Sequence, residues 1–503
     1  MRTTSEDEHL DVLIVGAGLS GIGAACHLRR EASDRSFAIL EARDAIGGTW
    51  DLFRYPGIRS DSDMHTLGYV FSPWRERQAL ADAPSILAYV RRNADEYGVS
   101  DRIRFGRRVV AARWSSQRAR WTVEAQRPDG EIERLTCSFL LTCCGYYDYD
   151  NGYAPAFAGA GRFAGPIVHP QHWPEDLDYD DKRVVVIGSG ATAVTLVPAL
   201  AQRAAHVTML QRSPSYVVAL PARDALAERV RRWLPEMAAY HLIRAKNVAV
   251  MTLSFQLSRR RPALMKALIR RGARAALPPG FDVETHFGPR YDPWDQRLCV
   301  CPDGDLFKAL SEGRASVVTD TVRTFTEDGI ELGCGEILPA DVIVTATGLR
   351  LQVLGGIRLF VDDREVSPRE TTVYMGAMLS GVPSFAFVMG YTNASWTLRA
   401  DLTCTFVTRL LGHMRERGWD WCMAPQPAPD APRRPLLNLS SGYVQRSLAQ
   451  FPAQGAASPW RVRQNYPLDR LELRRHRIDD GVLRFGALAA HDEARTDALA
   501  AAA

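Results

Sequence analysis

Residues 11–21 read DVLIVGAGLSG, and this stretch decides the fold of the first part of the chain. The apolar run 11–15 predicts a buried strand, and the spacing of Gly16, Gly18 and Gly21 predicts a tight turn into an Ala-rich helix that ends near residue 30. In such a strand–turn–helix unit, glycines let the backbone approach a pyrophosphate, and the helix N-terminus faces its charge. The sequence therefore predicts a dinucleotide-binding α/β unit.

A carboxylate at the expected distance supports this prediction. The next apolar run, residues 37–40, ends at Glu41, which lies 41 − 21 = 20 residues beyond the third glycine. An acidic side chain in this place holds the ribose hydroxyls of a dinucleotide. The first unit is therefore expected to bind a cofactor with free ribose hydroxyls, either FAD or NAD.

The same pattern recurs later with the opposite charge. Residues 183–187 form an apolar run that is followed by Gly188, Gly190 and Thr192. After the second apolar run, residues 207–210, Arg212 and Ser213 stand where the first unit has its acid. A guanidinium and a hydroxyl suit a 2′-phosphate, so the second unit is predicted to bind NADPH, with a solvated surface arginine as the alternative.

Two such units in one chain predict an α/β protein with two Rossmann-like dinucleotide-binding domains, for FAD and NADPH, and a helical insertion. Its length of 503 residues suits about three domains of ordinary size. We expect an FAD-binding domain in two parts, 1–150 and 341–490, and an NADPH-binding domain in two parts, 183–222 and 286–340. A hinge, 151–182, a helical insertion, 223–285, and a disordered tail, 491–503, complete the chain.

The hinge carries a distinctive motif. Residues 163–174 read FAGPIVHPQHWP, which is F-x-G-x-x-x-H-x-x-x-W-P with Phe163, Gly165, His169 and Trp173 at its fixed positions. This motif, placed between two nucleotide units, resembles the signature of the type I Baeyer–Villiger flavin monooxygenases. Further stretches, 60–64, 169–179, 294–299 and 390–397, are similar to the ethionamide-activating branch of that family. A stiff proline-rich linker that merely packs is the alternative.

The resemblance covers residues 10–485 and implies a reaction. Members of this family use FAD, NADPH and O2 to insert one oxygen atom beside a ketone carbonyl through a C4a-peroxyflavin, giving an ester or lactone. The branch also implies oxygenation of thioethers or thioamides. The expected partners are thus O2 and a small ketone or sulfur-containing substrate.

The resemblance also assigns roles to individual residues. A permanent positive charge is needed to hold the peroxide and the oxyanion that forms from the ketone, and Arg297 occupies the family position for it. Asp61 is the carboxylate implied to pair with Arg297, whereas a salt bridge of Arg297 with a nearby aspartate is the alternative. The loop with Gly48, Trp50 and Tyr55 is expected along the flavin ring, and Val109 is a further predicted cofactor contact.

Two further predictions concern the residue before Arg297 and a helix start near the C-terminus. Gln296 stands where many family members have a lysine, so Arg212 and Ser213 are expected to take more of the NADPH phosphate. Residues 390–397 predict a helix start with Asn393 as its N-cap, placed to face the flavin or simply to cap a packed helix.

Other features limit the alternatives. The net charge of +4 does not favour nucleic acid, and the sequence offers no leader peptide and no apolar run long enough to span a bilayer, which predicts a cytoplasmic protein. The stretch 223–280 is basic and helical in pattern, so it predicts a solvated subdomain, with weak binding to a membrane surface left open. The oligomeric state is not predicted.

Three other functions stay open. An N- or S-hydroxylating flavin monooxygenase shares both nucleotide units. An NADPH-dependent disulfide or quinone reductase would need a redox cysteine pair, and the nine cysteines show neither C-x-x-C nor metal-ligand spacing. A non-catalytic flavoprotein would bind FAD without oxidising NADPH in response to substrate.

Overall fold

The first nucleotide unit begins with β1 (His9–Val15), α1 (Leu19–Glu31) and β2 (Phe37–Leu40). In the computed structural model, which describes residues 8–488, β1 pairs in parallel with β2 on one side and with β6 (Ile132–Thr142) on the other. These strands form part of a nine-stranded sheet with the order β20-β19-β4-β5-β6-β1-β2-β3, and β23 also pairs with β6. The other strands are β3 (Ile103–Arg104), β4 (Arg108–Ser115), β5 (Arg120–Gln126), β19 (Arg358–Val361), β20 (Arg364–Val366) and β23 (Phe385–Phe387).

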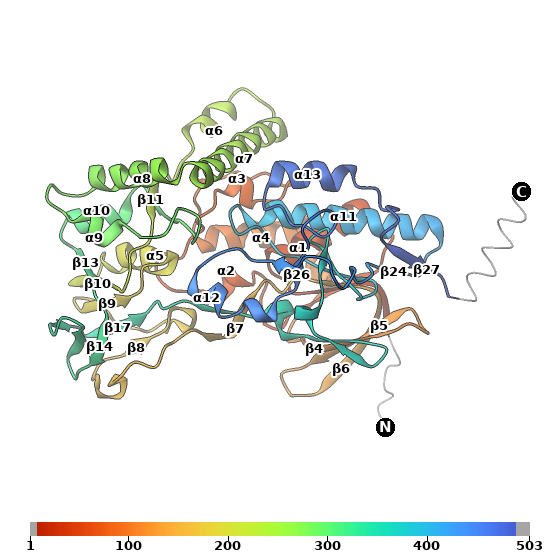
Figure 1. The fold of residues 1–503 in the computed structure, drawn as a ribbon, viewed down its shortest axis with the longest axis horizontal. Coiled ribbons are helices and arrows are strands. Elements are labelled where there is room, and N and C mark those ends of the chain that lie inside the picture. The colour runs from red at the N-terminus through yellow and green to blue at the C-terminus, as the bar shows by residue number, and fades with distance from the viewer. Residues whose placement is uncertain (1–7, 489–503) are drawn as a thin grey trace, which may run out of the picture.

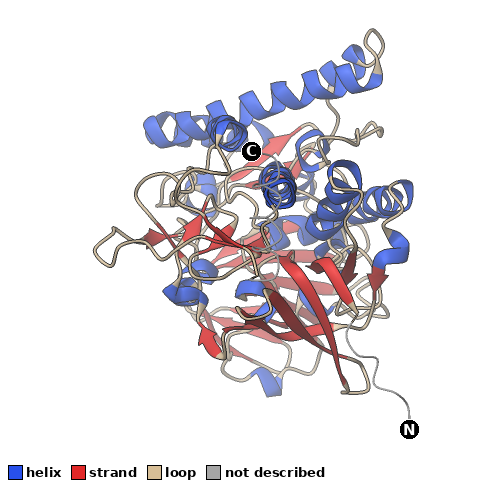
Figure 2. Ribbon diagram, turned by 90° about the vertical axis from the view of Figure 1, so that its right-hand side faces the viewer, coloured by secondary structure: helices blue, strands red, loops and turns tan. Residues whose placement is uncertain are grey.

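Helices cover this sheet on the side of α1, in the middle and right of Figure 1. They include α2 (Thr49–Leu52), α3 (Met64–Leu67), α4 (Ala83–Glu96), α11 (Trp396–Arg417) and α13 (Tyr466–Arg475). In α1, every residue from Leu19 to Leu28 is buried, because the helix is packed between the sheet, α4 and α11. Figure 2 shows this arrangement from the side, with the strands below and the helices above.

The second nucleotide unit is a five-stranded parallel sheet with the order β13-β10-β9-β17-β8. Its strands are β8 (Ile167–Val168), β9 (Arg183–Ile187), β10 (His206–Gln211), β13 (Ala315–Thr319) and β17 (Val342–Thr345). Its helices are α5 (Ala191–Leu200), α9 (Val283–Phe287) and α10 (Asp305–Ser311). The expected boundary at residue 340 needs correction, because β17 pairs with β9 and so belongs to this sheet.

The two units are joined by a two-stranded antiparallel ribbon. β7 (Tyr147–Gly152) leaves the first sheet and β18 (Leu349–Leu351) returns to it, with Leu349 opposite Gly152. The crossing therefore starts at residue 147, a few residues before the expected hinge. Within the range 151–182, β8 is already an edge strand of the second sheet.

The segment 223–285 contains α6 (Ala225–Val230), α7 (Glu236–Arg260) and α8 (Pro262–Ala276), and its expected end at residue 285 falls inside α9 of the second unit. Arg244 fastens α7 to the first unit: it is buried, donates to the carbonyl oxygens of His65 and Gly68 at 2.9 and 2.7 Å, and pairs with Asp401 of α11 at 3.2 Å. Arg244 thus provides hydrogen bonds to carbonyl oxygens at the C-terminal end of α3 and balances the charge of a buried carboxylate.

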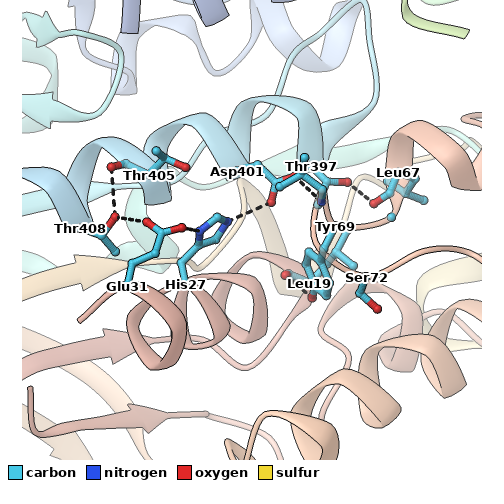
Figure 3. Close-up of polar contacts among 12 residues, drawn as sticks. Leu19, His27, Glu31, Leu67, Tyr69, Ser72, Thr397, Asp401, Thr405 and Thr408 are labelled. Carbon is cyan, nitrogen blue, oxygen red and sulfur yellow. Dashed lines mark hydrogen bonds and ion pairs between the residues drawn. The ribbon is translucent and has the colours of Figure 1, made fainter. Parts of the chain in front are cut away.

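The same carboxylate anchors α1 to α11, as Figure 3 shows. His27 of α1 lies between Glu31 and Asp401, with ring nitrogen to oxygen distances of 3.1 and 3.3 Å. Burial alone would lower the pKa of His27, but the hydrogen bonds to Asp401 and Glu31 raise it to about 9. The buried imidazole is therefore charged at neutral pH and is held by two carboxylates.

Smaller elements complete the chain. β14 to β16 form a three-stranded antiparallel sheet, and two-stranded pairs join β11 to β12, β21 to β22, β24 to β27 and β25 to β26. Their bounds, with α12, are β11 (Val217–Leu220), β12 (Cys299–Pro302), β14 (Val322–Phe325), β15 (Gly329–Leu332), β16 (Ile337–Pro339), β21 (Val373–Tyr374), β22 (Met378–Leu379), β24 (Trp421–Met423), β25 (Arg434–Pro435), α12 (Gly442–Gln445), β26 (Ala453–Gln454) and β27 (Arg484–Gly486). The predicted disordered tail, 491–503, lies outside the described residues.

Within residues 8–488, no helix has the length and apolar character that crossing a bilayer requires.

Candidate active site

The first glycine turn is tightly enclosed. Gly16 has a φ of +101°, and a Cβ there would lie 2.8 Å from the carbonyl oxygen of Cys143; a Cβ at Gly21 would lie only 1.8 Å from the carbonyl oxygen of Gly16. Gly18 is the N-cap of α1, and no side chain caps this helix. The turn therefore brings bare backbone and an uncapped helix N-terminus together, which fits a pyrophosphate.

Glu41 lies beside this turn at the end of β2. Its carboxylate accepts hydrogen bonds from the N–H of Ala17 at 2.7 Å and of Arg43 at 2.9 Å, and it is buried. A carboxylate fixed in this way keeps further lone pairs for hydroxyl donors, as a ribose requires. Val109, the other predicted contact of this region, lies on β4 in the apolar core of the first sheet.

The loop after β2 folds over the turn. Gly48 has a φ of +56°, and a Cβ there would lie 3.0 Å from the Cα of Gly18 and 3.1 Å from the Tyr149 hydroxyl. Trp50 on α2 packs against the apolar core around α1. The sequence predicts that the Tyr55 ring lies along the flavin. Instead, Tyr55 is buried in the core of the second unit, and its hydroxyl contacts Thr192. This loop thus ties the two units together.

The second glycine turn is more open than the first. Gly188 has a φ of +142°, and a Cβ there would lie 2.3 Å from the carbonyl oxygen of Ala346, so this position requires glycine. Around Gly190, the N-cap of α5, no atom of the described chain other than its two sequence neighbours lies within 4 Å of where a Cβ would stand. The N-terminus of α5 also lacks a capping side chain and faces outward, as a phosphate site would.

Arg212 and Ser213 follow β10 beside this turn. Both residues are exposed, and Ser189 donates from its hydroxyl to the carbonyl oxygen of Ser213 at 2.9 Å. In the part of the chain that the structure describes, Arg212 forms no salt bridge and no side-chain hydrogen bond. Its guanidinium is thus free for a phosphate group.

Arg297 lies at the meeting point of both units and the C-terminal region. Its Nη2 donates to the hydroxyl of Tyr146 at 2.9 Å, and its Nε is buried without a hydrogen-bond partner among the described residues. The Tyr146 phenol raises the pKa of Arg297 above its ordinary value, although burial acts in the opposite direction. A fixed cation with an unused buried donor is suited to bind an oxyanion.

An aromatic bridge connects Arg297 to the first glycine turn. The ring of Tyr146 lies 5.1 Å from that of Trp396, centre to centre, and Trp396 donates from Nε1 to the hydroxyl of Ser20 at 2.7 Å. Ser20 is in the first turn of α1. Tyr146 and Trp396 therefore link Arg297 to the N-terminal turn of α1.

Asp61 faces Arg297 and Arg59 but forms no ion pair with either in the described chain, because Arg59 pairs with Asp305. The Asp61 side chain is accessible to solvent, yet enough protein surrounds it that burial raises its pKa to about 6, against the effect of the two arginines. Accessible surface combined with desolvation is typical of a concave site. The expected close pairing of Asp61 with Arg297 is thus present only as a longer-range attraction.

The loop that carries Arg297 is held by α7 and by the C-terminal region. Trp294 has a φ of +71°, a rare conformation for a tryptophan, and its ring packs against Phe255 of α7. Asp295 pairs with Arg259 of α7 at 2.6 Å and accepts hydrogen bonds on its carbonyl oxygen from Ser440. Gln296, which stands for the family lysine, forms no side-chain hydrogen bond with described residues.

The hinge motif belongs to the second unit and contacts the ribbon. Phe163 packs on Phe325, and a Cβ at Gly165 would lie 2.3 Å from the carbonyl oxygen of Asp341, so both hold β8 on its sheet. Trp173 packs against the core of the second unit. His169 reaches the ribbon, because its Nε2 lies 3.3 Å from the carbonyl oxygen of Gly348.

Several residues of the site have no signal in the sequence. Tyr146 and Ser440 contact the Arg297 loop from more than 140 residues away, and the buried Gln171 donates to the carbonyl oxygens of Asp148 and Tyr149 in β7. The expected N-cap role of Asn393 is wrong, since α11 begins at Trp396 and Ser395 is its N-cap. Asn393 instead donates to the carbonyl oxygen of Gln464 at 2.8 Å.

Comparison with known proteins gives three kinds of match. The family of flavin-binding monooxygenase-like proteins matches residues 70–226, and the family of NAD(P)-binding Rossmann-like domains matches residues 14–79. The chain is 54% identical over 479 residues to the FAD-containing monooxygenase EthA of Mycobacterium tuberculosis, a match that covers 95% of this chain and 98% of the relative. The EthA of Mycolicibacterium smegmatis is 51% identical, with 95% and 97% covered.

A solved structure, an oxidised steroid monooxygenase bound to NADP, has a similar fold with a TM-score of 0.74. It is 23% identical in sequence, and the match covers 95% of this chain and all of that one.

Proposed function

Because this chain belongs to the family of FAD-containing monooxygenases, in the branch of EthA, we propose that it is an NADPH- and O2-dependent Baeyer–Villiger monooxygenase. It would convert a ketone, O2, NADPH and a proton into an ester or lactone, NADP+ and water. The observation that carries this proposal is the position of Arg297, whose buried Nε has no hydrogen-bond partner within residues 8–488 and whose Nη2 is fixed by Tyr146.

The two nucleotide turns divide the cofactors between them. The turn at Gly16 to Gly21, with Glu41 for the ribose, would hold FAD, and the turn at Gly188 with the free Arg212 would hold NADPH. When bound, FAD supplies the redox chemistry, in which it accepts a hydride from NADPH and activates O2. The tightly packed loop at Gly48 and Trp50 would keep water away from this reaction.

Arg297 would then provide the charge that the oxygen insertion needs. Addition of an oxygen nucleophile to a ketone turns the carbonyl oxygen into an oxyanion, and a preorganised cation stabilises that charge. Tyr146 orients the guanidinium, and Asp61 adjusts the local field without neutralising it through a close salt bridge. Arg297 and Asp61 are the proposed catalytic and positioning residues.

The thiols of the site favour this proposal over a disulfide reductase. A redox pair reacts through a thiolate, which requires a thiol of low pKa. Cys143 and Cys144, beside the first turn, are enclosed by protein, and burial raises the pKa of the Cys144 thiol to about 12. These cysteines are therefore suited to packing. A hydroxylating monooxygenase stays the nearest alternative, and product analysis separates it from a Baeyer–Villiger enzyme.

The test is aerobic NADPH oxidation by the FAD-loaded protein with linear, cyclic and aryl ketones, while ester and hydrogen peroxide are both quantified. A thioether and a thioamide are included, since the branch resemblance implies sulfur oxygenation as well. Arg297→Ala should keep FAD and its reduction by NADPH but lose ester formation by a factor of about 100 or more. Arg290→Ala, an exposed arginine in the same loop, is the matched control. Ester formation at the parent rate in Arg297→Ala would refute the role of this residue.

A further inference from the structure

The helical insertion displays an unusual number of exposed apolar side chains. Of the seventeen large apolar residues that are exposed in the described chain, ten lie between residues 226 and 268. Trp233 is 82% exposed, Leu253 68% and Val250 61%, whereas such side chains are normally buried. Leu242 and Leu257 continue the same exposed face of α7, and Leu264 and Leu268 extend it onto α8. A cluster of this kind on one subdomain indicates an interaction surface.

The charges around this surface have one sign. The segment 223–276 contains only three acidic residues, and each is already paired: Asp224 with Lys246, Glu228 with Arg77 and Glu236 with Arg75. Six arginines of the same segment form neither a salt bridge nor a side-chain hydrogen bond with described residues: Arg223, Arg229, Arg232, Arg260, Arg261 and Arg271. The surface thus combines exposed apolar groups with uncompensated positive charge.

The helices that carry these residues lie at the outside of the molecule. Figure 1 shows α6, α7 and α8 along one edge of the molecule, and in Figure 2 a long helix crosses the top of the body. The buried residues of α7, such as Tyr240, Arg244 and Val248, face the first unit, so its apolar exposed face points away from the protein. No other described segment covers that face.

From these features we propose that the exposed face of α6 to α8 docks on the surface of an anionic phospholipid bilayer. An amphipathic helix with Leu, Val and Trp on one side and arginines beside them lies in the bilayer interface without crossing it. Arginines at the edges of the apolar face pair with lipid phosphates, and tryptophan is favoured at this depth. The unpaired charges therefore match an anionic membrane.

A second copy of the chain is the competing occupant, and the charges disfavour it. A twofold contact would place the same surface on both sides, so unpaired arginines would face arginines without any free carboxylate to balance them.

The experiment measures binding of the FAD-loaded full chain to vesicles by cosedimentation. Vesicles of phosphatidylcholine with about 30 mol% phosphatidylglycerol should bind the protein at least tenfold more strongly than pure phosphatidylcholine, and salt should weaken this binding. The variant Val250→Glu/Leu253→Glu should reduce binding by about tenfold or more, because it places charge in the apolar face. Arg260→Ser/Arg261→Ser should reduce binding to anionic vesicles only.

The matched control is Ile132→Glu/Ile337→Glu, which changes two exposed apolar residues outside the insertion, at 44% and 54% exposure, and should bind like the parent. In parallel, Trp233→Phe should remove part of the blue shift of tryptophan fluorescence that anionic vesicles induce. FAD content and NADPH oxidation of each variant show that it is folded, independently of vesicle binding. Equal binding of the parent and the Val250/Leu253 variant would overturn the proposal. Self-association that the same variant abolishes, without vesicle binding, would overturn it in favour of a second copy.

Discussion

The two glycine turns of this protein come from the same sequence pattern but are built differently. The first is packed against β6, the loop at Gly48 and α11, and its carboxylate Glu41 is buried and hydrogen-bonded to the turn itself. The second leaves Gly190 in open space and ends in an exposed, unpaired Arg212.

The difference matches the proposed roles of the two cofactors. A cofactor that stays bound through many turnovers gains from an enclosed site, whereas a coenzyme that enters and leaves needs an open one. The helices differ in the same sense, since α1 is anchored by the charged network at His27, while the buried residues of α5 carry no charge.

The test with the largest expected effect replaces one glycine of each turn with alanine. Gly21→Ala would place a methyl group 1.8 Å from the carbonyl oxygen of Gly16, so we expect loss of FAD or of soluble protein, a cost of about 3 kcal/mol or more. Gly190→Ala meets no atom within 4 Å and should keep FAD fully. The measurement is the ratio of flavin to protein absorbance after purification. Similar FAD loss in both variants would mean that the two turns are equally tight.

The second test concerns the anchor of α1. His27 has a pKa raised to about 9 in the folded protein, so its stabilising effect is complete below its unfolded pKa of about 6.5 and disappears as the pH rises through 9. His27→Gln should cost on the order of 3 kcal/mol at pH 6 and much less near pH 9.

The thermal midpoint of the FAD-loaded protein at both pH values checks this prediction. His206→Gln in the second unit is the control, because the His206 ring bonds to the Ser316 hydroxyl at 2.8 Å and pairs with no carboxylate of residues 8–488. A loss in His27→Gln that does not change with pH would show that the histidine acts by packing alone.

The third test addresses the charge at the second turn. Arg212→Ala should remove a preference for NADPH over NADH of at least about tenfold in kcat/KM, equivalent to about 1.4 kcal/mol. Steady-state kinetics with both coenzymes measure it, and Arg223→Ala, another exposed arginine that forms no ion pair with the described part of the chain, is the control. If the parent uses NADH and NADPH equally well, the second turn does not recognise the 2′-phosphate.

The smallest expected effect lies between the two turns. His169 contacts the ribbon at Gly348, so His169→Ala should leave FAD binding intact but divert a few-fold more NADPH to hydrogen peroxide, a cost below about 1 kcal/mol. Trp173→Ala should behave similarly, because it loosens the segment from the second core. The exposed His172→Ala serves as comparison. An unchanged ratio of ester to peroxide in His169→Ala and Trp173→Ala would reduce the hinge motif to a packed linker.

Much of the fold could be predicted because the signals are local. The α/β class and the two Rossmann-like units are confirmed, and the family resemblance is confirmed by the 54% identity to EthA. The boundary at residue 340 was wrong because a strand such as β17 reads the same in sequence whichever sheet it joins. The N-cap at Asn393 was wrong because Ser395, two residues later, offers the same kind of start to α11.

The sequence by itself determined the two glycine turns, the carboxylate and the arginine that follow them, and the hinge motif, since each depends on residues close together in the chain. Only the tertiary structure decided what surrounds Arg297. Tyr146 comes from the end of the first sheet, Ser440 from the C-terminal region and Arg259 from the insertion, and all three meet at one loop. A charge acquires its chemical role from the donors, rings and desolvation around it, and chain folding brings these together from distances that no local pattern records.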